Sequence, residues 1–533
     1  MRDSDRSMRG SMRGSMRGKV FTASEAVSCL RDGSVIGISG VNVVGVPFEL
    51  IDAIARLYRE KQRPKSITVI NSANNGGVHI LAAEGLIGKY IAGFPTLDAC
   101  AEGPGFLDGD KIPVFSLTQG IAAQFYGAQA AGVPYLMRHI PGTYLDPAVE
   151  GGCANEKARE LAKTEPLVKP ISIGGEEYLH IDMPKVDAVL IRASVSDELG
   201  NLSDCDEMVK CEILPMAMAA RNNGGTVIAQ VDRLVEQGQL DAADVKVPGM
   251  LVDRVVICSD PKRFSPQNHT GVYQPGVTGR YRVAPETIPF DIWAPAGEKL
   301  VMARRAAMEI NPGNIVNFGL GAPMGVPYVT AAEGVQDMYY PTVELGAIGG
   351  YPGGGPFFSG AFNPDAFLRH DEMFSFINGG GLDMTFLGAA EIGRDGSVNV
   401  SRFAGRTNGS GGFINISSNT KKIIFMCLHT SGGKPKFIPE VGQVTFCGPE
   451  AAQKGRDVAY ITERAVFRLI DGKVTLTEAA EGLDIEKDVI GAMGFRPAVS
   501  YCLKPIPAEC FVDRPLGLRQ RWEGLLATAR SAP

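Results

Sequence analysis

The strongest constraint on the fold of this 533-residue chain is that one segment occurs twice. Residues 33–47, GSVIGISGVNVVGVP, align without gaps on residues 313–327, GNIVNFGLGAPMGVP. Each copy begins with a turn, runs through β-branched or aromatic residues, and reaches a glycine-rich loop that closes on Gly-Val-Pro. Internal similarity of this kind predicts two related structural units.

A second pair of segments follows in the same order. Residues 186–203 and 382–399 each place an Asp before an apolar strand, and Gly200 and Gly396 stand at the same offset beyond it. Short β-branched runs such as SITVI, TVIAQV and RVVIC are typical of strands buried in parallel sheets. The apolar spacing in FELIDAIARLY predicts a helix directly after the first glycine-rich turn. The sequence therefore predicts an α/β fold with two related open sheets and helices on both faces of each.

We expect three structural parts after a short tail. Residues 1–18 repeat a Ser-Met-Arg-Gly unit without an apolar core, so they are interpreted as a disordered tail or a cloning remnant, and the acidic residues within them count against a transit peptide. Residues 19–275 would form the first half and residues 299–533 the second half. Residues 276–298 lie in a stretch rich in Pro, Gly and polar residues, which favours a linker.

The bulk composition narrows the class of protein. Lys and Arg number 53 against 59 Asp and Glu, a balance that argues against a protein that binds nucleic acid. No uncharged apolar run approaches the ~18 residues that a membrane span needs. The ten cysteines form no C-x-x-C pair, which indicates small buried side chains in a reducing compartment. We therefore expect a soluble, cytoplasmic protein.

Several common catalytic motifs are missing from the sequence. It has no G-x-S-x-G elbow, no H-E-x-x-H and no G-x-x-x-x-G-K-[ST], which disfavours a serine hydrolase, a zinc enzyme and a P-loop enzyme. The six histidines are scattered without metal-ligand spacing, at positions 79, 139, 180, 269, 370 and 429. We expect a structural role for each of them, and no metal.

One carboxylate stands in an unusual place. In YYPTVELGAIGGYPGGGPFFSG, residues 339–360, Glu344 follows a short predicted strand, and seven glycines occupy the next sixteen residues. Ligands of open α/β sheets bind beyond the carboxyl ends of the strands, where a carboxylate can attack a reactive carbonyl. Glycines there, Gly346 among them, would let a substrate approach the backbone. The structural alternative is that Glu344 caps a turn and the glycines only close loops.

These segments resemble the family I CoA-transferases, especially the single-chain acetate or propionate CoA-transferases with two fused halves. The resemblance covers nearly the whole chain after residue 19 and is carried by VELGAIGG, NGGGLDMTFLGAAEIGRDGSVNVSRFAG, NGSGGFINIS, GNIVNFGLGAP, SGVNVVGVPFELIDA and SLTQGIAAQ. It implies the CoA-transferase fold, with the active site between the two halves. Glu344, in Val-Glu-Leu-Gly, matches the family's nucleophile, which forms a glutamyl-CoA thioester. The Val and Leu beside it depart from the Ser-Glu-Asn-Gly of the ketoacid branch, which disfavours a 3-ketoacid specialist.

The resemblance also implies roles for residues around Glu344. The side chain of Gln119, in LTQG, and the backbone of Gly412, in NGSGGF, would stabilise the oxyanion. The implied CoA contacts are Asn317, Gly319, Gly321, Gly380 and Gly381, with the last two bordering the same cleft. The implied pocket for the acyl group or the carboxylate acceptor contains Asn42, Gly45 and Gly346.

The implied function is transfer of CoA from a short-chain acyl-CoA to a free carboxylate such as acetate, by ping-pong chemistry. CoA would then be a substrate and a transient covalent adduct, and the protein would be a homodimer or homotetramer. Two alternatives stay open: an acyl-CoA hydrolase that uses the same Glu344 with water, and a non-catalytic ligand-sensing module, because fold alone does not fix function. Dependence of thioester loss on an added carboxylate would distinguish a CoA-transferase from an acyl-CoA hydrolase. The presence of Glu344 and of both glycine loops argues against a non-catalytic module.

Overall fold

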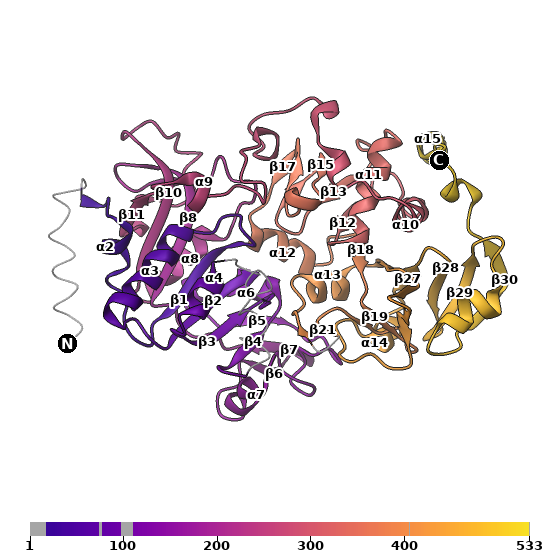
Figure 1. Ribbon diagram of the computed structural model, residues 1–533, viewed down its shortest axis with the longest axis horizontal. Coiled ribbons are helices and arrows are strands. Elements are labelled where there is room, and N and C mark those ends of the chain that lie inside the picture. The colour runs from indigo at the N-terminus through magenta and orange to yellow at the C-terminus, as the bar shows by residue number, and fades with distance from the viewer. Residues whose placement is uncertain (1–17, 74–76, 97–109, 404–405, 532–533) are drawn as a thin grey trace.

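The computed structural model describes residues 18–73, 77–96, 110–403 and 406–531. The tail predicted for residues 1–18 lies outside these ranges, apart from Gly18. Two large sheets lie side by side, one built from each half of the chain (Figure 1). The predicted α/β class with two related halves is therefore confirmed.

The first sheet is parallel along its main path. Its order is β11 (Arg254–Ile257), β10 (Thr226–Val235), β8 (Ala188–Asp197), β1 (Val35–Val41), β2 (Ile67–Ala73), β3 (Ile87–Ala92) and β4 (Val114–Ser116), with the short β9 (Leu202–Ser203) antiparallel beside β8. Apolar side chains of α2 (Ala23–Val27), α3 (Phe48–Lys61) and α4 (Val78–Ala83) pack on one face. Those of α6 (Gln119–Ala131) and α8 (Ile213–Asn222) pack on the other. The predicted runs SITVI, TVIAQV and RVVIC are confirmed as β2, β10 and β11.

The second sheet has a parallel centre flanked by antiparallel pairs. Its order is β17 (Ala366–Phe367), β14 (Ala347–Ile348), β13 (Tyr340–Thr342), β12 (Ile315–Phe318), β18 (Met384–Gly388), β23 (Lys422–Met426), β27 (Asp457–Ile461), β28 (Ala465–Ile470), β29 (Lys473–Ala479) and β30 (Ala498–Pro505). The edge strand β30 is parallel to β29. Side chains of α10 (Glu298–Ala307), α11 (Gly325–Ala332) and α15 (Leu518–Ser531) pack on one face. Those of α12 (His370–Asn378), α13 (Phe413–Asn419) and α14 (Gly448–Gln453) pack on the other.

The two sheets repeat the same strand order at their centres. The run β2-β1-β8-β10-β11 in the first corresponds to β13-β12-β18-β23-β27 in the second, and every neighbouring pair is parallel. The repeated aspartates explain part of this likeness. Oδ2 of Asp187 accepts from the N–H of Val35 at 2.9 Å, and Oδ2 of Asp383 accepts from the N–H of Ile315 at 3.0 Å. Each aspartate thus satisfies a donor at the start of the neighbouring strand, where the ladder has not yet begun.

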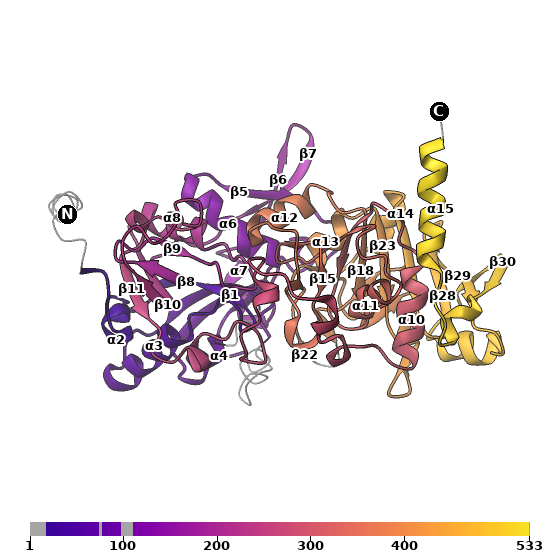
Figure 2. The ribbon, with the colours of Figure 1, turned by 90° about the horizontal axis from the view of Figure 1, so that it is seen from above.

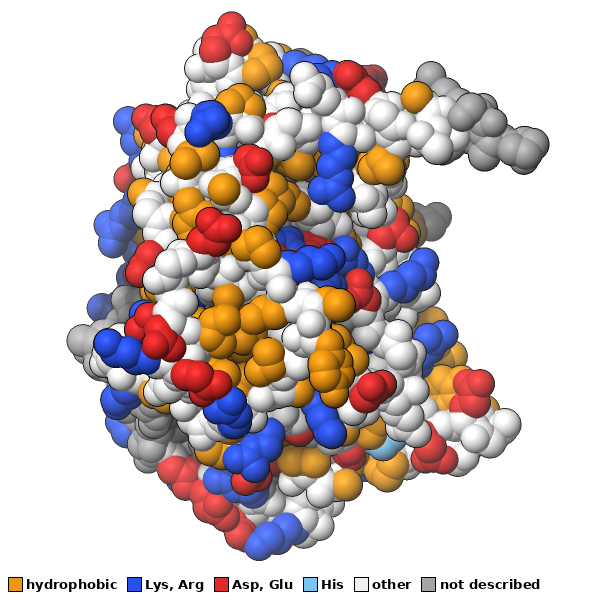
Figure 3. Space-filling model, turned by 90° about the vertical axis from the view of Figure 1, so that its right-hand side faces the viewer, with side chains coloured by type: hydrophobic (Ala, Val, Ile, Leu, Met, Phe, Trp, Pro, Cys, Tyr) orange, Lys and Arg blue, Asp and Glu red, His pale blue; other side chains and the backbone are white. Residues whose placement is uncertain are grey.

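Two parts extend from the body of the molecule. The three-stranded sheet of β5 (Tyr135–Arg138), β7 (Glu176–Ile181) and β6 (Val168–Ile173) projects beside the junction of the halves, and α15 projects at the opposite end (Figure 2). Figure 3 looks at the end that carries β30 and shows hydrophobic side chains gathered near the middle of that face. The edge strand β30 is exposed over most of its length.

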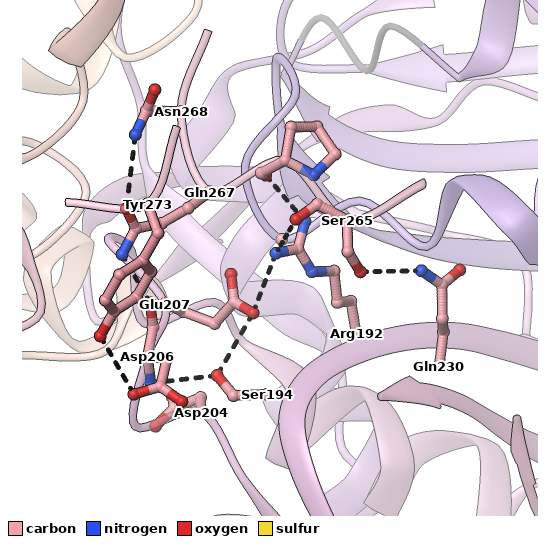
Figure 4. A network of polar contacts seen from close by, with 12 residues as sticks. Arg192, Ser194, Asp204, Asp206, Glu207, Gln230, Ser265, Gln267, Asn268 and Tyr273 are labelled. Atoms are coloured by element: carbon pink, nitrogen blue, oxygen red, sulfur yellow. Dashed lines mark hydrogen bonds and ion pairs between the residues drawn. The ribbon is translucent and has the colours of Figure 1, made fainter. Parts of the chain in front are cut away.

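The chain crosses from one half to the other through residues 260–298, and the start of this crossing is bound to the first sheet. The buried Arg192 of β8 donates to the carbonyls of Ser265 and Pro266 at 2.9 Å each, and it pairs with Glu207 at 3.2 Å (Figure 4). Farther along, the crossing contacts both halves: the His269 N–H donates to the Pro356 carbonyl at 3.2 Å, and Arg280 interacts with Cys205 of the first half. The Asn363 N–H donates to the Gly276 carbonyl at 2.8 Å, and Asn363 exchanges two further hydrogen bonds with Val283. We propose that residues 19–275, 276–298 and 299–533 are the first half, the linker and the second half, because the crossing contacts both halves and α10 begins at Glu298.

The halves share one continuous apolar core at their junction. The cluster that lies between the first sheet, α6 and α8 also contains Val343, Leu345 and Phe362 of the second half. Beside it, Gln124 of α6 donates to Ser375 of α12 at 2.8 Å and accepts from Asn378 at 2.9 Å. This packing brings the start of α6 against the start of α12, and the candidate site lies there.

Candidate active site

Glu344 stands on a tight turn at the carboxyl end of β13. The Gly346 N–H donates to the Val343 carbonyl at 2.8 Å, and the Val343 N–H donates to the Ala347 carbonyl at 2.9 Å. Gly346 has φ +106°, which side chains rarely adopt, so glycine is needed for the chain to reverse into β14. The turn presents the Glu344 side chain beyond the sheet and explains why a glycine follows the carboxylate so closely.

Glu344 lines a cavity of about 220 Å³ between the two halves. Val41, Phe94 and other residues of the first half form one wall, and Leu320, Phe413 and other residues of the second half form the opposite wall. The polar side chains that line it are Asn42, Gln119, Glu344, Ser359 and Ser410. The other described lining residues are apolar or glycine, and none of them is Lys or Arg.

The surroundings of Glu344 in the cavity shift the pKa of its carboxyl group. Burial raises the pKa of the Glu344 carboxyl to about 7, because the apolar surroundings disfavour the charged form. His370 opposes this shift by favouring the negative charge, but its effect on the pKa is smaller. A carboxylate with a pKa near neutrality and no cation among the described lining residues is a typical candidate for a reactive group.

Gln119 is positioned by backbone hydrogen bonds from both halves. It is the first residue of α6, which begins with the side chain of Thr118 accepting from the Ile121 N–H. The Gln119 N–H donates to the Gly411 carbonyl at 2.8 Å, and the Gly411 N–H donates to the Gly93 carbonyl at 2.9 Å. The loop before α13 is thereby inserted between two segments of the first half. The structure thus brings Gln119, predicted from sequence, into the same cavity as Glu344.

Behind Gln119 lies a buried chain of polar side chains that sequence reasoning missed. Nδ1 of His370 lies 2.8 Å from Oε2 of Glu212, and Nε2 of His370 lies 2.8 Å from Nε2 of Gln119. All three side chains are almost fully buried. A carboxylate only accepts, so His370 Nδ1 donates to Glu212, and the Gln119 amide nitrogen that faces Nε2 can only donate. His370 has the satisfied contacts of a structural histidine, but those contacts fix the amide that faces the cavity.

Gly412 lies directly against the Glu344 carboxylate. A Cβ placed on Gly412 would be 2.6 Å from Oε2 of Glu344 and 3.0 Å from Cζ of Phe374. Gly412 immediately precedes α13 and also lines the cavity. The structure therefore brings together the three residues expected to carry the chemistry: Glu344, Gln119 and Gly412. Glycine at position 412 is required because any side chain would displace the carboxylate.

The first-half loop contributes Asn42 but not Gly45. Val41 and Val44 exchange two hydrogen bonds of 2.9 Å, so Asn42 stands at the tip of a tight turn with φ +54° and lines the cavity. Gly45, at φ +69°, lies outside the cavity lining, and a Cβ there would meet the Cys211 sulfur at 2.7 Å. Gly45 shapes the turn that holds Asn42, whereas Asn42 itself faces the cavity.

The loop after β12 reaches the cavity in part. Gly319 lines it, and its N–H donates to the Phe386 carbonyl at 2.8 Å. Gly321, two residues on, has φ +88° and is not a lining residue. Asn317 is fully buried within β12, and neither atom of its amide has a hydrogen-bond partner among the described residues. The structure thus places Gly319 at the cavity and leaves Asn317 beneath the surface.

Gly380 and Gly381 do not border the Glu344 cavity, contrary to the expectation from sequence. They precede β18, whereas Gly388 at the other end of β18 lines the cavity. Five residues of strand span about 16 Å. The amino end of β18, which follows Gly380 and Gly381, is therefore far from its carboxyl end, which borders the cavity. Gly380 instead lines a separate surface cleft with Arg138 and Lys421.

The described ranges contain no group of three or more His, Cys, Asp or Glu side chains arranged to hold a metal ion. In the same ranges, every helix is too short or too polar to span a lipid bilayer.

Comparison with known proteins identifies the class to which this site belongs. The family model described as Coenzyme A transferase matches residues 20–257. The chain is 35% identical to the caffeate CoA-transferase of Acetobacterium woodii, over 95% of this chain and 98% of the relative. It is 34% identical to the acetate CoA-transferase YdiF of Escherichia coli K12, over 93% and 96%. The crystal structure of YdiF from Escherichia coli O157:H7 superposes with a TM-score of 0.85 at 33% identity, covering 94% of this chain and 98% of that one.

The chain belongs to the family I CoA-transferases. It is an enzyme that transfers CoA from an acyl-CoA to a carboxylate. A thioester complex of YdiF with CoA has a TM-score of 0.84 at 32% identity, over 94% of this chain and 98% of that one, which supports CoA as substrate here. A citrate lyase alpha subunit from Streptococcus mutans, described as putative in its name, shares only the fold, with 15% identity and a TM-score of 0.53.

His370 is expected to act through Gln119. His370→Ala removes the acceptor that orients the Gln119 amide, and losing an oriented oxyanion donor typically costs about 10²–10³ in rate. We expect kcat to fall by about 10- to 100-fold in the wild-type background and by less than about threefold in a Gln119→Ala background. Steady-state kinetics of the four proteins, with melting temperatures as a control for folding, measure this difference. Equal losses in both backgrounds would mean that His370 only supports the fold.

Proposed function

We propose that this enzyme transfers CoA from a short-chain acyl-CoA to a free carboxylate such as acetate, with Glu344 as the covalent nucleophile. The observation that carries the proposal is the placement of the Glu344 carboxylate against Gly412 in a cavity that both halves close. The family relationship supplies the reaction, and the cavity supplies a carboxylate with a raised pKa and hydrogen-bond donors beside it.

The first half-reaction moves the acyl group and then the thiol. An oxygen of Glu344 attacks the thioester carbonyl, the C–S bond breaks, and the products are an acyl-glutamyl anhydride and the CoA thiolate. The thiolate then attacks Cδ of Glu344, and the anhydride C–O bond breaks. The first carboxylic acid leaves as its carboxylate, and the glutamyl-CoA thioester remains.

The second half-reaction repeats these steps in reverse with a new carboxylate. The incoming carboxylate attacks Cδ of Glu344 and releases the thiolate, which then attacks the new acyl carbon. The new acyl-CoA departs and the Glu344 carboxylate is restored. No step needs a general acid or base, because the reacting groups are carboxylates and a thiolate.

Gln119 and Gly412 are proposed to stabilise the tetrahedral oxyanions. The Gln119 amide has two N–H donors, and only one is used by His370. The Gly412 backbone adjoins Oε2 of Glu344, where negative charge develops in the attack on Cδ. Donors fixed before the reaction stabilise such charge without the cost of reorganising solvent.

The apolar lining favours transfer over hydrolysis. Val41, Phe94, Leu387 and Phe413 line the cavity together with Glu344, and apolar walls of this kind exclude water from a reactive thioester. The acid acceptor is proposed to be a short-chain carboxylate. Relatives named for caffeate and for acetate are almost equally similar to this chain, so the acceptor panel should contain both an aromatic acid and acetate.

Incubation with acetyl-CoA should add one CoA to the intact protein, as measured by mass spectrometry. Addition of acetate or propionate should discharge the adduct and produce the corresponding acyl-CoA, whereas without acceptor the adduct should persist for many turnover times. Glu344→Gln, which keeps the side-chain size, should form no adduct and should show no ping-pong turnover.

Two results would contradict this proposal. Adduct formation by the Glu344→Gln protein would remove Glu344 as nucleophile. Discharge to free CoA at the same rate with and without carboxylate would assign the enzyme to acyl-CoA hydrolysis.

We also propose that the protein is a homodimer or homotetramer, and that the end carrying β30 and α15 takes part in the interface. Tyr501 and Val499 are exposed on the edge strand, and Leu525 and Leu526 are exposed on the projecting helix. Exposed edge strands and apolar patches are typical of interaction surfaces.

Sedimentation velocity should give a mass that is a multiple of 56.8 kDa, and the double variant Leu525→Asp with Leu526→Asp should shift this mass toward that of the monomer. A wild-type monomer would contradict the proposal.

A further inference from the structure

Ser359 combines two unfavourable features at the wall of the Glu344 cavity. It lies between the short helix η7 (Gly355–Phe357) and β16 (Ala361–Phe362), and its φ is +89°. This region of backbone conformation is costly for any residue with a side chain. The Ser359 side chain is also only 2% exposed, and its hydroxyl has no hydrogen-bond partner among the described residues.

The turn that carries Ser359 is held firmly in place. The Gly353 N–H donates to the Gly360 carbonyl at 2.9 Å, and the Gly360 N–H donates to the Phe357 carbonyl at 3.1 Å. Gly360 packs so closely on Met208 of the first half that a Cβ would lie 2.6 Å from its sulfur. The two halves together therefore impose the backbone conformation of Ser359.

Ser359 is one of the residues that line a cavity without Lys or Arg among its described lining residues. An unpaired buried hydroxyl costs free energy, and one beside a ligand site is explained when the ligand supplies the missing partner. The acid substrate arrives as an anion, and none of the described lining residues is Lys or Arg. Its carboxylate must therefore be bound by neutral donors.

The other polar side chains of the cavity leave few such donors. One N–H of Gln119 is engaged by His370, the Ser410 hydroxyl donates to the Gly411 carbonyl at 3.4 Å, and the Asn42 amide belongs to a half-buried residue. The buried Ser359 side chain also lines the cavity, and its O–H group makes no hydrogen bond within the described part of the chain.

We propose that the Ser359 hydroxyl donates a hydrogen bond to the carboxylate of the acid substrate, and that it binds each acid as it enters or leaves. This inference rests on the proposed function, because it concerns the carboxylate that exchanges with CoA at Glu344. It makes Ser359 a substrate-contacting residue that recognises the carboxylate common to small organic acids.

The test measures binding without catalysis. Propionate and, separately, free CoA are titrated by ligand-observed NMR into the wild-type protein, Ser359→Ala and Ser359→Gly, with no acyl-CoA present. At pH 6 most Glu344 side chains are protonated, so the charge of Glu344 resembles that of the neutral thioester. We expect the Kd for propionate to rise by about tenfold or more in both variants, and the Kd for CoA to change by less than about twofold.

The two variants separate the hydroxyl from the backbone. Gly adopts φ +89° without strain, so Ser359→Gly should melt at or above the wild-type temperature, whereas Ser359→Ala keeps the strain. Because both lack the hydroxyl, both should lose propionate affinity, and Ser359→Gly keeps the test valid even where Ser359→Ala folds poorly.

Three outcomes decide the matter. Weaker propionate binding with unchanged CoA binding supports the proposal. An unchanged Kd for propionate overturns it, and so does a rise confined to CoA, which would assign the hydroxyl to the pantetheine arm. A wild-type protein that binds propionate but forms no CoA adduct would refute the proposed function without affecting the measured role of Ser359 in propionate binding. Failure of the proposed function and failure of the Ser359 proposal can therefore be told apart.

Discussion

The insertion of one loop of the second half into the first half is the contact on which the rest of the site depends. The backbone of Gly411 accepts from the Gln119 N–H and donates to the Gly93 carbonyl, and this places Gly412 against Glu344. The start of α6 and the start of α12 then meet, so that His370 can hold the Gln119 amide. Neither half could form this cavity alone, because Glu344 and Gln119 come from different halves of the chain. The duplication of an α/β unit therefore led to a division of roles between its copies.

The same geometry makes Glu344 costly to ionise. Its carboxyl lies among apolar side chains, and burial raises its pKa to about 7. Conversion to a neutral anhydride or thioester removes the buried charge, and the departing carboxylate carries that charge out to water. The site thus favours the covalent state relative to an exposed carboxylate. Fixed neutral donors, rather than a cation, are compatible with this arrangement, because a nearby Lys or Arg would lower the pKa and stabilise the unreacted carboxylate.

Much of this could be predicted from the sequence, because the repeated segments, the parallel strands and the glycine after Glu344 depend on local pattern. The site residues that were missed depend on tertiary contacts. His370 lies 251 residues from Gln119, and no sequence spacing links them. Gly380 was expected to border the same cleft as Glu344, but strand β18 separates its motif from the residues that reach the cavity. The positive φ of Ser359 is likewise imposed by packing against Met208 and has no signal in a Phe-Ser-Gly sequence.

The most direct test of the central claim is the pH dependence of covalent adduct formation in a single turnover. In the proposed mechanism the ionised Glu344 carboxylate is the attacking species, and its fraction falls as the pH falls through its pKa of about 7. Rapid-quench measurements with acetyl-CoA from pH 5.5 to 8.5 should therefore show a rate that rises with pH, with a midpoint near 7. A rate that is constant over this range would mean that the nucleophile has the pKa of an ordinary exposed carboxyl or is a different group, and it would contradict the account.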